Sequence, residues 1–91
     1  MNDSRKTPPQ IEVDLHLHAQ LREVAGGGIV PLRLPAGSTV ADAFESVIKV
    51  HPGLADFRNV VAFACNDCLV TGVATLDGGD RLDVLPPVSG G

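Results

Sequence analysis

The last six residues of the chain are of the types that a reactive C-terminal tail needs. They read Pro86-Pro87-Val88-Ser89-Gly90-Gly91. Glycine has no Cβ, so a Gly-Gly end can pass through a channel that is too narrow for side chains. The two prolines keep the base of the tail extended, and six extended residues span roughly 20 Å at about 3.3–3.6 Å per residue. The tail is therefore long enough to carry the carboxylate of Gly91, its candidate reactive group, into a recessed site.

The two cysteines form a lone Cys-x-x-Cys motif, Cys65 to Cys68. A structural zinc site needs four ligands, so His16 and His18 would have to supply the other two. Redox motifs of this type normally begin at a helix N-terminus, where the thiolate is stabilised. Here the two residues between the cysteines predict a β-turn. We interpret the cysteines as small apolar residues of a hairpin, and we expect no metal site.

Two glycine-containing segments and the histidines have structural interpretations. Gly26-Gly27-Gly28 lacks the Lys-Ser/Thr of a phosphate loop, so we interpret it as a flexible connection. Asp77-Gly78-Gly79-Asp80 is too short for a calcium loop and predicts a turn. No Ser or Asp spacing suggests a catalytic triad with His16 or His18, and surface histidines are the default interpretation of both.

Charge and hydropathy exclude several classes of protein. The net charge of −4 argues against a nucleic-acid binder, which would need a basic face. The basic residues are scattered along the chain, and no apolar run approaches the length that spans a bilayer, so we expect no membrane partner. The first ten residues, MNDSRKTPPQ, lack the apolar stretch of a signal peptide. We therefore expect a cytoplasmic protein with reduced cysteines.

The N-terminal half predicts two strands and a helix. Apolar and polar residues alternate from Ile11 to Ala19, which is typical of a half-buried strand. A helical turn over 20–25 leads to a second strand over 29–34, where Pro31 indicates an edge position or a bulge. Thr39 is a good N-cap for a helix that His51-Pro52-Gly53 ends. The apolar face of that helix has the i, i+3, i+4, i+7, i+8 spacing: Val40, Ala43, Phe44, Val47 and Ile48.

The C-terminal half predicts three more strands. After a connector over 54–59, the apolar run 60–65 is consistent with a central strand. A tight turn leads from it into a short strand over 68–71, and 81–85 alternates once more. The first and last strands could pair side by side, because each needs a partner to bury its apolar face. The fold class is therefore α+β, with one main helix packed on one face of a mixed sheet.

Three motifs in this order of elements resemble the molybdopterin synthase small subunit. They are Leu17-His18-Ala19-Gln20-Leu21-Arg22-Glu23, Ala64-Cys65-Asn66, and the segment Leu76 to Leu82 followed by the tail from Pro86 to Gly91. The resemblance extends from about Val13 to Gly91, and the C-terminal motif is its most specific part. It implies a β-grasp, or ubiquitin-like, fold, with a leader over 1–10, a β-grasp domain over 11–85 and a flexible tail over 86–91.

The resemblance also implies a function without catalytic side chains. An E1-like enzyme would adenylate Gly91 with ATP, and a sulfur donor protein would convert the transient acyl-adenylate to a thiocarboxylate. The tail would then enter the large catalytic subunit of molybdopterin synthase and give its sulfur to a pterin precursor. No permanently bound cofactor is expected. The residues expected to contact partners are Gly90, Ser89, Val88, Pro87, Pro86, Leu85, Leu69 and His18.

The chain departs from the family pattern at His18, where the family usually has an aromatic residue. The first ten residues also have no counterpart in the shorter members. Three alternatives stay open: a sulfur carrier for cysteine or thiamine synthesis, a ubiquitin-like modifier joined to lysines through Gly91, and a binding module with an incidental Gly-Gly end. Proline pairs before Gly-Gly are unusual in the thiamine carrier, which favours the molybdopterin branch.

Overall fold

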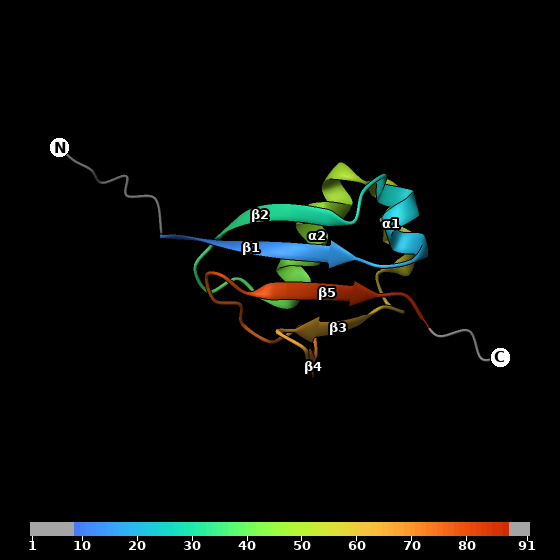
Figure 1. Cartoon of the computed structure of the whole chain (residues 1–91). Coiled ribbons are helices and arrows are strands. Elements are labelled where there is room, and N and C mark those ends of the chain that lie inside the picture. Colours follow the sequence, from blue (N-terminus) through green and yellow to red (C-terminus); the bar gives the residue numbers. More distant parts are fainter. Residues whose placement is uncertain (1–8, 88–91) are drawn as a thin grey trace.

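The fold is built on a five-stranded mixed β-sheet. The computed structural model describes residues 9–87. Its strands are β1 (Gln10–Leu17), β2 (Ile29–Pro35), β3 (Ala62–Cys65), β4 (Cys68–Val70) and β5 (Arg81–Leu85). They lie in the order β2-β1-β5-β3-β4, and β1 runs parallel to β5 while the other neighbours are antiparallel (Figure 1). The predicted pairing of the first and last strands is confirmed.

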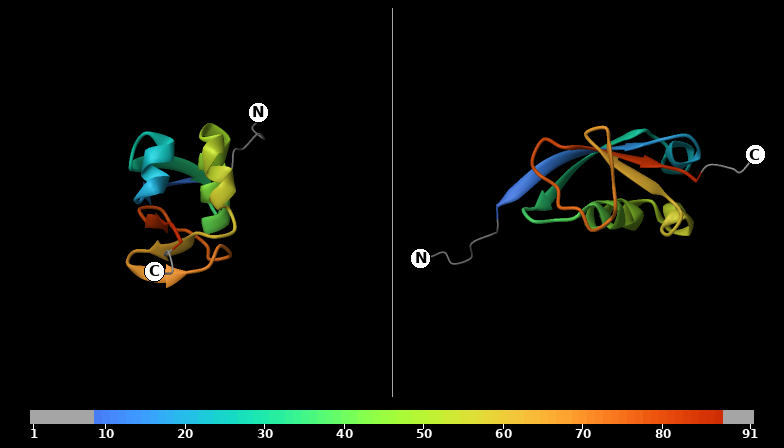
Figure 2. Two further views of the ribbon diagram at one scale, coloured as in Figure 1. Left: turned by 90° about the vertical axis from the view of Figure 1, so that its right-hand side faces the viewer. Right: turned by 90° about the horizontal axis from the view of Figure 1, so that it is seen from below.

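Helices cover one face of this sheet. The main helix is α2 (Val40–Val50), and a 3-10 helix, η1 (Pro52–Phe57), follows it on the same side, whereas the short helix α1 (Gln20–Ala25) lies at one end of the sheet (Figure 2). The sheet therefore has an inner face under α2 and η1, and an outer face that no helix of residues 9–87 covers. None of the helices in this segment is both long and apolar enough to cross a membrane.

The inner face forms the core. The five predicted apolar positions of α2 are all buried, and Phe44 packs edge-on against Phe63 of β3 with ring centroids 5.8 Å apart. The inward side chains of β1 and β5 are almost fully buried: Val13, Leu15, Leu17, Leu82 and Val84. Alternation with a period of two puts the residues between them on the outer face.

Helix α2 begins and ends where the sequence predicts. The Thr39 hydroxyl accepts a hydrogen bond from the Asp42 backbone N–H at 3.1 Å, and the Asp42 carboxylate accepts one from the Thr39 N–H at 2.9 Å. This capping box satisfies two donors that the first turn would otherwise leave unpaired. At the other end, Pro52 stops the helix and starts η1.

Most predicted boundaries agree with the structure, and the differences are local. The fold begins before Ile11: the Pro9 carbonyl accepts a hydrogen bond from Ala36 N–H at 2.8 Å, and Gln10 pairs with Pro35. The first strand ends at Leu17, because Ala19 has a φ of 52° and turns the chain into α1. The 60–65 run forms a strand only from Ala62, and Pro31 lies in β2, an edge strand as predicted.

Candidate functional site

The candidate site is the outer face of β5 and its neighbours, at the end where the tail leaves. Strand β5 is central, and Pro86 and Pro87 follow it directly, with Pro86 half-buried and Pro87 exposed. Val88, Ser89, Gly90 and Gly91 lie outside the described residues. The predicted reactive group is thus attached to the middle strand of the sheet through two prolines.

The register places the predicted partner-binding residues on one face. Ala64 pairs with Leu69 on one side and with Asp83 on the other, so Leu69 and Asp83 share a face. Leu85 is two residues beyond Asp83 and therefore points the same way. His18 follows Leu17, which pairs with Val84, so His18 lies beside Leu85. The register thus places His18, Leu69 and Leu85 on the same outer face, with His18 beside Leu85 and Leu69 on the edge strand β4.

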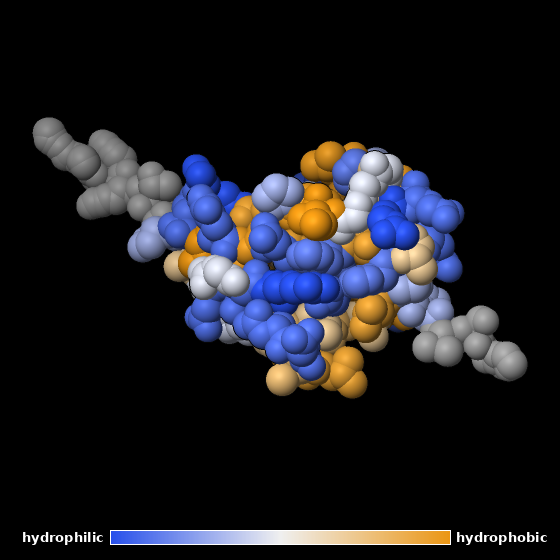
Figure 3. Space-filling view, viewed as in Figure 1, coloured by the Kyte–Doolittle hydropathy of each residue, from blue (hydrophilic) through white to orange (hydrophobic). Residues whose placement is uncertain are grey.

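The exposed apolar surface of this face lies over β3 and β4. Leu69 is 79 % exposed, although leucine side chains in folded proteins are usually buried. Ala62 and Ala64 of β3 flank it with small side chains, and the space-filling view shows hydrophobic colour at the β3–β4 edge beside a largely hydrophilic centre (Figure 3). We name Ala62, Ala64, Leu69 and Leu85 the apolar strip. The apolar strip is a candidate contact surface, because exposed apolar groups that lie next to one another often mark interaction sites.

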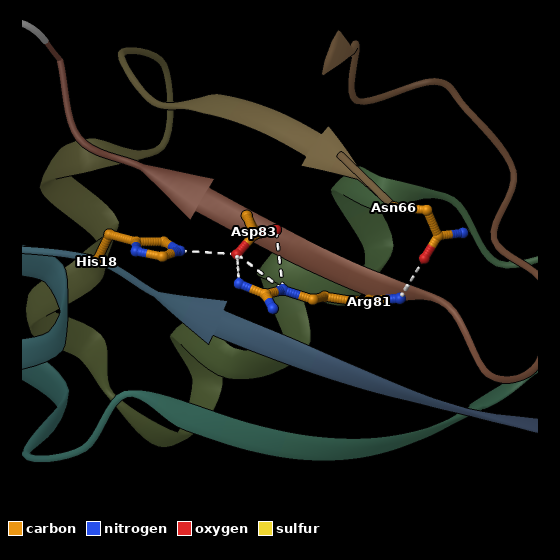
Figure 4. A network of polar contacts seen from close by, with 4 residues as sticks. All are labelled: His18, Asn66, Arg81 and Asp83. Carbon is orange, nitrogen blue, oxygen red and sulfur yellow. Dashed lines mark hydrogen bonds and ion pairs between the residues drawn. The ribbon is translucent and has the colours of Figure 1, made fainter. Parts of the chain in front are cut away.

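A polar network lies beside the apolar strip. The carboxylate of Asp83 accepts hydrogen bonds from the Arg81 guanidinium at 3.0–3.2 Å and contacts His18 Nε2 at 2.7 Å (Figure 4). Burial acts to raise the pKa of Asp83, but the hydrogen bonds from Arg81 and His18 outweigh it and hold that pKa below its usual value. Asp83 is therefore ionised at neutral pH.

Asn66 fixes the far end of this network to the β3–β4 hairpin. Its side-chain oxygen accepts a hydrogen bond from Arg81 N–H, and its amide nitrogen donates one to Asp80, both at 2.9 Å. Asn66 and Asp67 have φ values of 50° and 71°, which a two-residue hairpin turn requires. The predicted turn at Asp77 to Asp80 is also confirmed, and the backbone N–H of Asp77 holds the pKa of Asp80 below its usual value.

The two cysteines lie at this hairpin, away from the tail. Cys65 and Cys68 face each other across the turn as free thiols. Burial raises the pKa of Cys65 to about 11, and the negative charge of Asp80 is the second cause. This thiol is therefore a poor nucleophile. Within residues 9–87, no group of three or more His, Cys, Asp or Glu side chains is placed to hold a metal ion. The position of the two cysteines on either side of the β3–β4 turn agrees with the hairpin interpretation of the motif.

Asp83 and Arg81 are functional candidates that sequence reasoning missed. The alternation over 81–85 predicts an outward and solvated Asp83, yet the residue is only 6 % exposed. The available signal was positional: His18 and Asp83 both occupy outward positions of two strands that were expected to pair. The parallel register pairs Asp83 with His16 and leaves His18 within hydrogen-bond distance of Asp83, near the base of the tail.

Comparisons with known proteins identify the family. The ThiS family matches residues 15–91. The chain belongs to the ThiS family. The match covers every helix and strand from α1 onward, the tail, and the last three residues of β1, so the Gly-Gly end and most of the described scaffold lie inside it. The predicted relationship to the sulfur-carrier subunits is confirmed.

Relatives of this ThiS-family chain come from two groups. It is 32 % identical over 81 residues to the molybdopterin synthase sulfur carrier subunit of Arabidopsis thaliana, covering 89 % of this chain and 84 % of the plant protein. It is 32 % identical to small archaeal modifier protein 1 of Haloferax volcanii, covering 82 % and 95 %. The crystal structure of that modifier superposes with a TM-score of 0.79 at 28 % identity, covering 88 % and 99 %. The predicted ubiquitin-like β-grasp fold is confirmed.

Proposed function

We propose that this chain is a sulfur carrier and the small subunit of molybdopterin synthase, with the sulfur held as a thiocarboxylate at Gly91. One observation carries the proposal: the tail ending in Gly-Gly extends from the central strand of a ThiS-family fold, beside an exposed apolar strip. The plant relative, named as a molybdopterin synthase sulfur carrier subunit, supports the choice of pathway. The proposed compartment is the cytoplasm.

The chemistry needs no side chain of this protein. A carboxylate is a poor electrophile, so ATP would first convert Gly91 to an acyl-adenylate, with pyrophosphate leaving. Hydrosulfide delivered by the donor protein would then attack the carbonyl carbon and displace AMP, leaving the thiocarboxylate and one released proton. The E1-like enzyme would hold the catalytic groups for adenylation, and the large subunit those for sulfur transfer. The contribution of this chain is to position the reacting carbon.

The fold suits that positioning task. Strand β5 is paired on both sides, so the base of the tail starts from a fixed point. Ordering the tail in a partner costs about 1–2 kcal/mol per residue in backbone entropy. Burying Leu69 and Leu85 against the partner would offset part of that cost, at about 25 cal/mol per Å² of apolar surface. The apolar strip is therefore the proposed docking surface for the large subunit.

A second candidate function is ubiquitin-like protein modification. The similarity to small archaeal modifier protein 1, in sequence and in fold, favours it. In that case an amine, such as the ε-amino group of a lysine, would attack the Gly91 adenylate and form an amide. A sulfur carrier for cysteine or thiamine synthesis would use the same tail chemistry with another acceptor.

Reconstitution with candidate acceptors separates these functions. Thiocarboxylated chain is mixed with the large subunit of the same organism and the pterin precursor, and formation of the sulfur-containing pterin is measured. We expect product with the full chain and none with the Gly91-deleted chain. The thermal unfolding of the deleted chain should match that of the full chain. Conjugates on lysines without pterin product would instead support the modifier function. Activity of the Gly91-deleted chain would contradict both.

A further inference from the structure

Asp83 is a buried carboxylate on the face of the sheet that no helix within residues 9–87 covers. Its side chain is 8 % exposed, whereas the neighbouring positions of the outer face are half-buried or exposed. Two side chains cover it: Arg81 from its own strand and His18 from the end of β1 (Figure 4). Both remain accessible, with 52 % of the Arg81 side chain and 39 % of the His18 side chain exposed. A partner on this face would meet the histidine and arginine rather than the acid.

The hydrogen bond to Asp83 fixes which nitrogen of His18 carries the proton. An ionised carboxylate only accepts hydrogen bonds. Since His18 Nε2 lies 2.7 Å from Asp83 Oδ1, Nε2 must donate. In a neutral imidazole the other nitrogen then carries a lone pair and no hydrogen. Nδ1 of His18 makes no hydrogen bond to another residue within 9–87 and is available as an acceptor.

This acceptor lies where a partner must approach to receive the tail. Leu17 pairs with Val84, so His18 lies alongside Leu85, next to Pro86. A partner that encloses the tail and covers the apolar strip would also take Nδ1 out of water. A buried acceptor without a hydrogen-bond donor is unfavourable, so the covering surface needs a donor at this point.

We propose that His18, held by Asp83 with Nε2 protonated, is a specificity-determining residue that selects partner surfaces with a hydrogen-bond donor facing Nδ1. The donor is a backbone N–H, a hydroxyl or a basic side chain of the protein that receives the tail. The inference rests on the proposed function, because it assumes that a partner covers the outer face. It adds the polar chemistry that the apolar strip does not specify.

The other titratable groups near His18 define the controls. On the outer face of β1, Asp14 pairs with Arg81 in the register and His16 pairs with Asp83. Glu12 is further along β1 and is paired with Arg33 of β2 at 2.9 Å. His16 is on the same strand face as His18 but makes no hydrogen bond to Asp83 in the described structure, which makes it the matched control.

The tautomer is tested first, in the free chain. Nitrogen-15 NMR of the imidazole rings separates protonated from unprotonated nitrogens. At about pH 8, where histidine is normally neutral, we expect His18 to show protonated Nε2 and unprotonated Nδ1. We expect this preference to be lost in the Asp83→Asn chain, since its amide can donate as well as accept. Protonated Nδ1 in the unaltered chain would overturn the proposal whatever the partner is.

The affinity for the large subunit of the same organism is tested next. His18→Phe removes the acceptor and leaves a donor of the partner unsatisfied, so binding should weaken by about ten-fold. His16→Phe should change it by about two-fold or less. His18→Asn, whose amide oxygen can accept near the place of Nδ1, should bind better than His18→Phe. Equal weakening by both Phe substitutions, or none by His18→Phe, would overturn the proposal.

Rescue by asparagine gives a readout that a packing role would not move. His18→Asn restores an acceptor but not the imidazole ring, so its binding should recover part of what His18→Phe loses. Binding no tighter for His18→Asn than for His18→Phe would contradict the assigned role. Absent thiocarboxylation of Gly91 would contradict only the proposed function, because the tautomer is read without the tail chemistry.

Discussion

The two faces of β5 carry side chains of different kinds. Leu82 and Val84 point inward and are fully buried, packed between α2 and the neighbouring strands. Arg81, Asp83 and Leu85 point outward, where one ion-paired acid lies beside an apolar strip. The same five residues therefore supply the core and the proposed docking surface.

The difference shows how a small domain can separate stability from recognition. The inner face needs apolar side chains of matching shape, because interiors are close-packed. The outer face is free of that constraint and can hold polar groups, provided that they satisfy each other. Substitutions on the two faces should therefore have effects of different kinds: those on the inner face should lower stability, and those on the outer face should weaken binding.

Leu82→Ala should have the largest effect on the folded state. Leu82 is completely buried, so the substitution loses apolar contact and leaves a cavity, which costs about 2–5 kcal/mol of the free energy of unfolding. Urea unfolding followed by circular dichroism measures the change. Leu69→Ala is the matched control on the outer face, expected to cost about 0.5 kcal/mol or less. Similar losses in the two variants would remove the distinction between the faces.

Leu69→Ala should instead affect docking. The side chain is 79 % exposed in the free chain, and its proposed burial against the large subunit would be lost. Calorimetric titration should show binding weakened by about ten-fold, which corresponds to about 1.4 kcal/mol. Val50→Ala, on an exposed position of α2, is the control and should leave binding unchanged. If the α2 variant weakened binding and the β4 variant did not, the docking surface would be on the other side.

Thr39→Ala should loosen the inner face without altering the outer one. It removes the capping hydroxyl from the first turn of α2, at a cost of about 1 kcal/mol. Urea unfolding measures the loss, and the imidazole NMR signals of His18 report whether the outer network is intact. We expect lower stability with an unchanged His18–Asp83 hydrogen bond. A change of the His18 tautomer in this variant would show that the two faces are coupled.

The stability of the chain at low pH should reveal how much Asp83 contributes to the free energy of unfolding. Its pKa is lowered in the folded chain, so its stabilising contribution is present above its unfolded pKa of about 3.9 and is lost as the pH falls through the folded pKa. Asp83→Asn should therefore show a smaller loss of stability between about pH 5 and pH 2. Asp80, whose pKa is lowered too, should keep part of the slope. Unfolding free energies with the same pH slope in both chains would contradict the assignment.

The sequence predicts elements that local physics determines. The capping box at Thr39, the apolar spacing of α2 and the turns at Asn66 and Asp77 each follow from residues within a few positions of one another. The boundaries at Ala19 and Val60 were less well predicted. At Ala19 the chain must turn into α1 with a positive φ, and no glycine marks the place.

The polar network could not be predicted in the same way, because its members are far apart in sequence. His18 and Asp83 are 65 positions apart and meet only because β1 and β5 pair in parallel with Leu17 beside Val84. Alternation alone marks Asp83 as outward and solvated. Its burial results from two long side chains that close over it, which depends on the register and not on any local pattern.

The intact mass of the chain after reaction tests the central claim most directly. The chain is incubated with the E1-like enzyme of the same organism, ATP and a sulfur donor, and its mass is measured beside that of the Gly91-deleted chain. The proposed function predicts replacement of one oxygen by one sulfur in the full chain, located at Gly91 by fragmentation, and no change in the deleted chain. An unchanged mass of the full chain, in a reaction where the enzyme adenylates another substrate, would contradict the sulfur-carrier account.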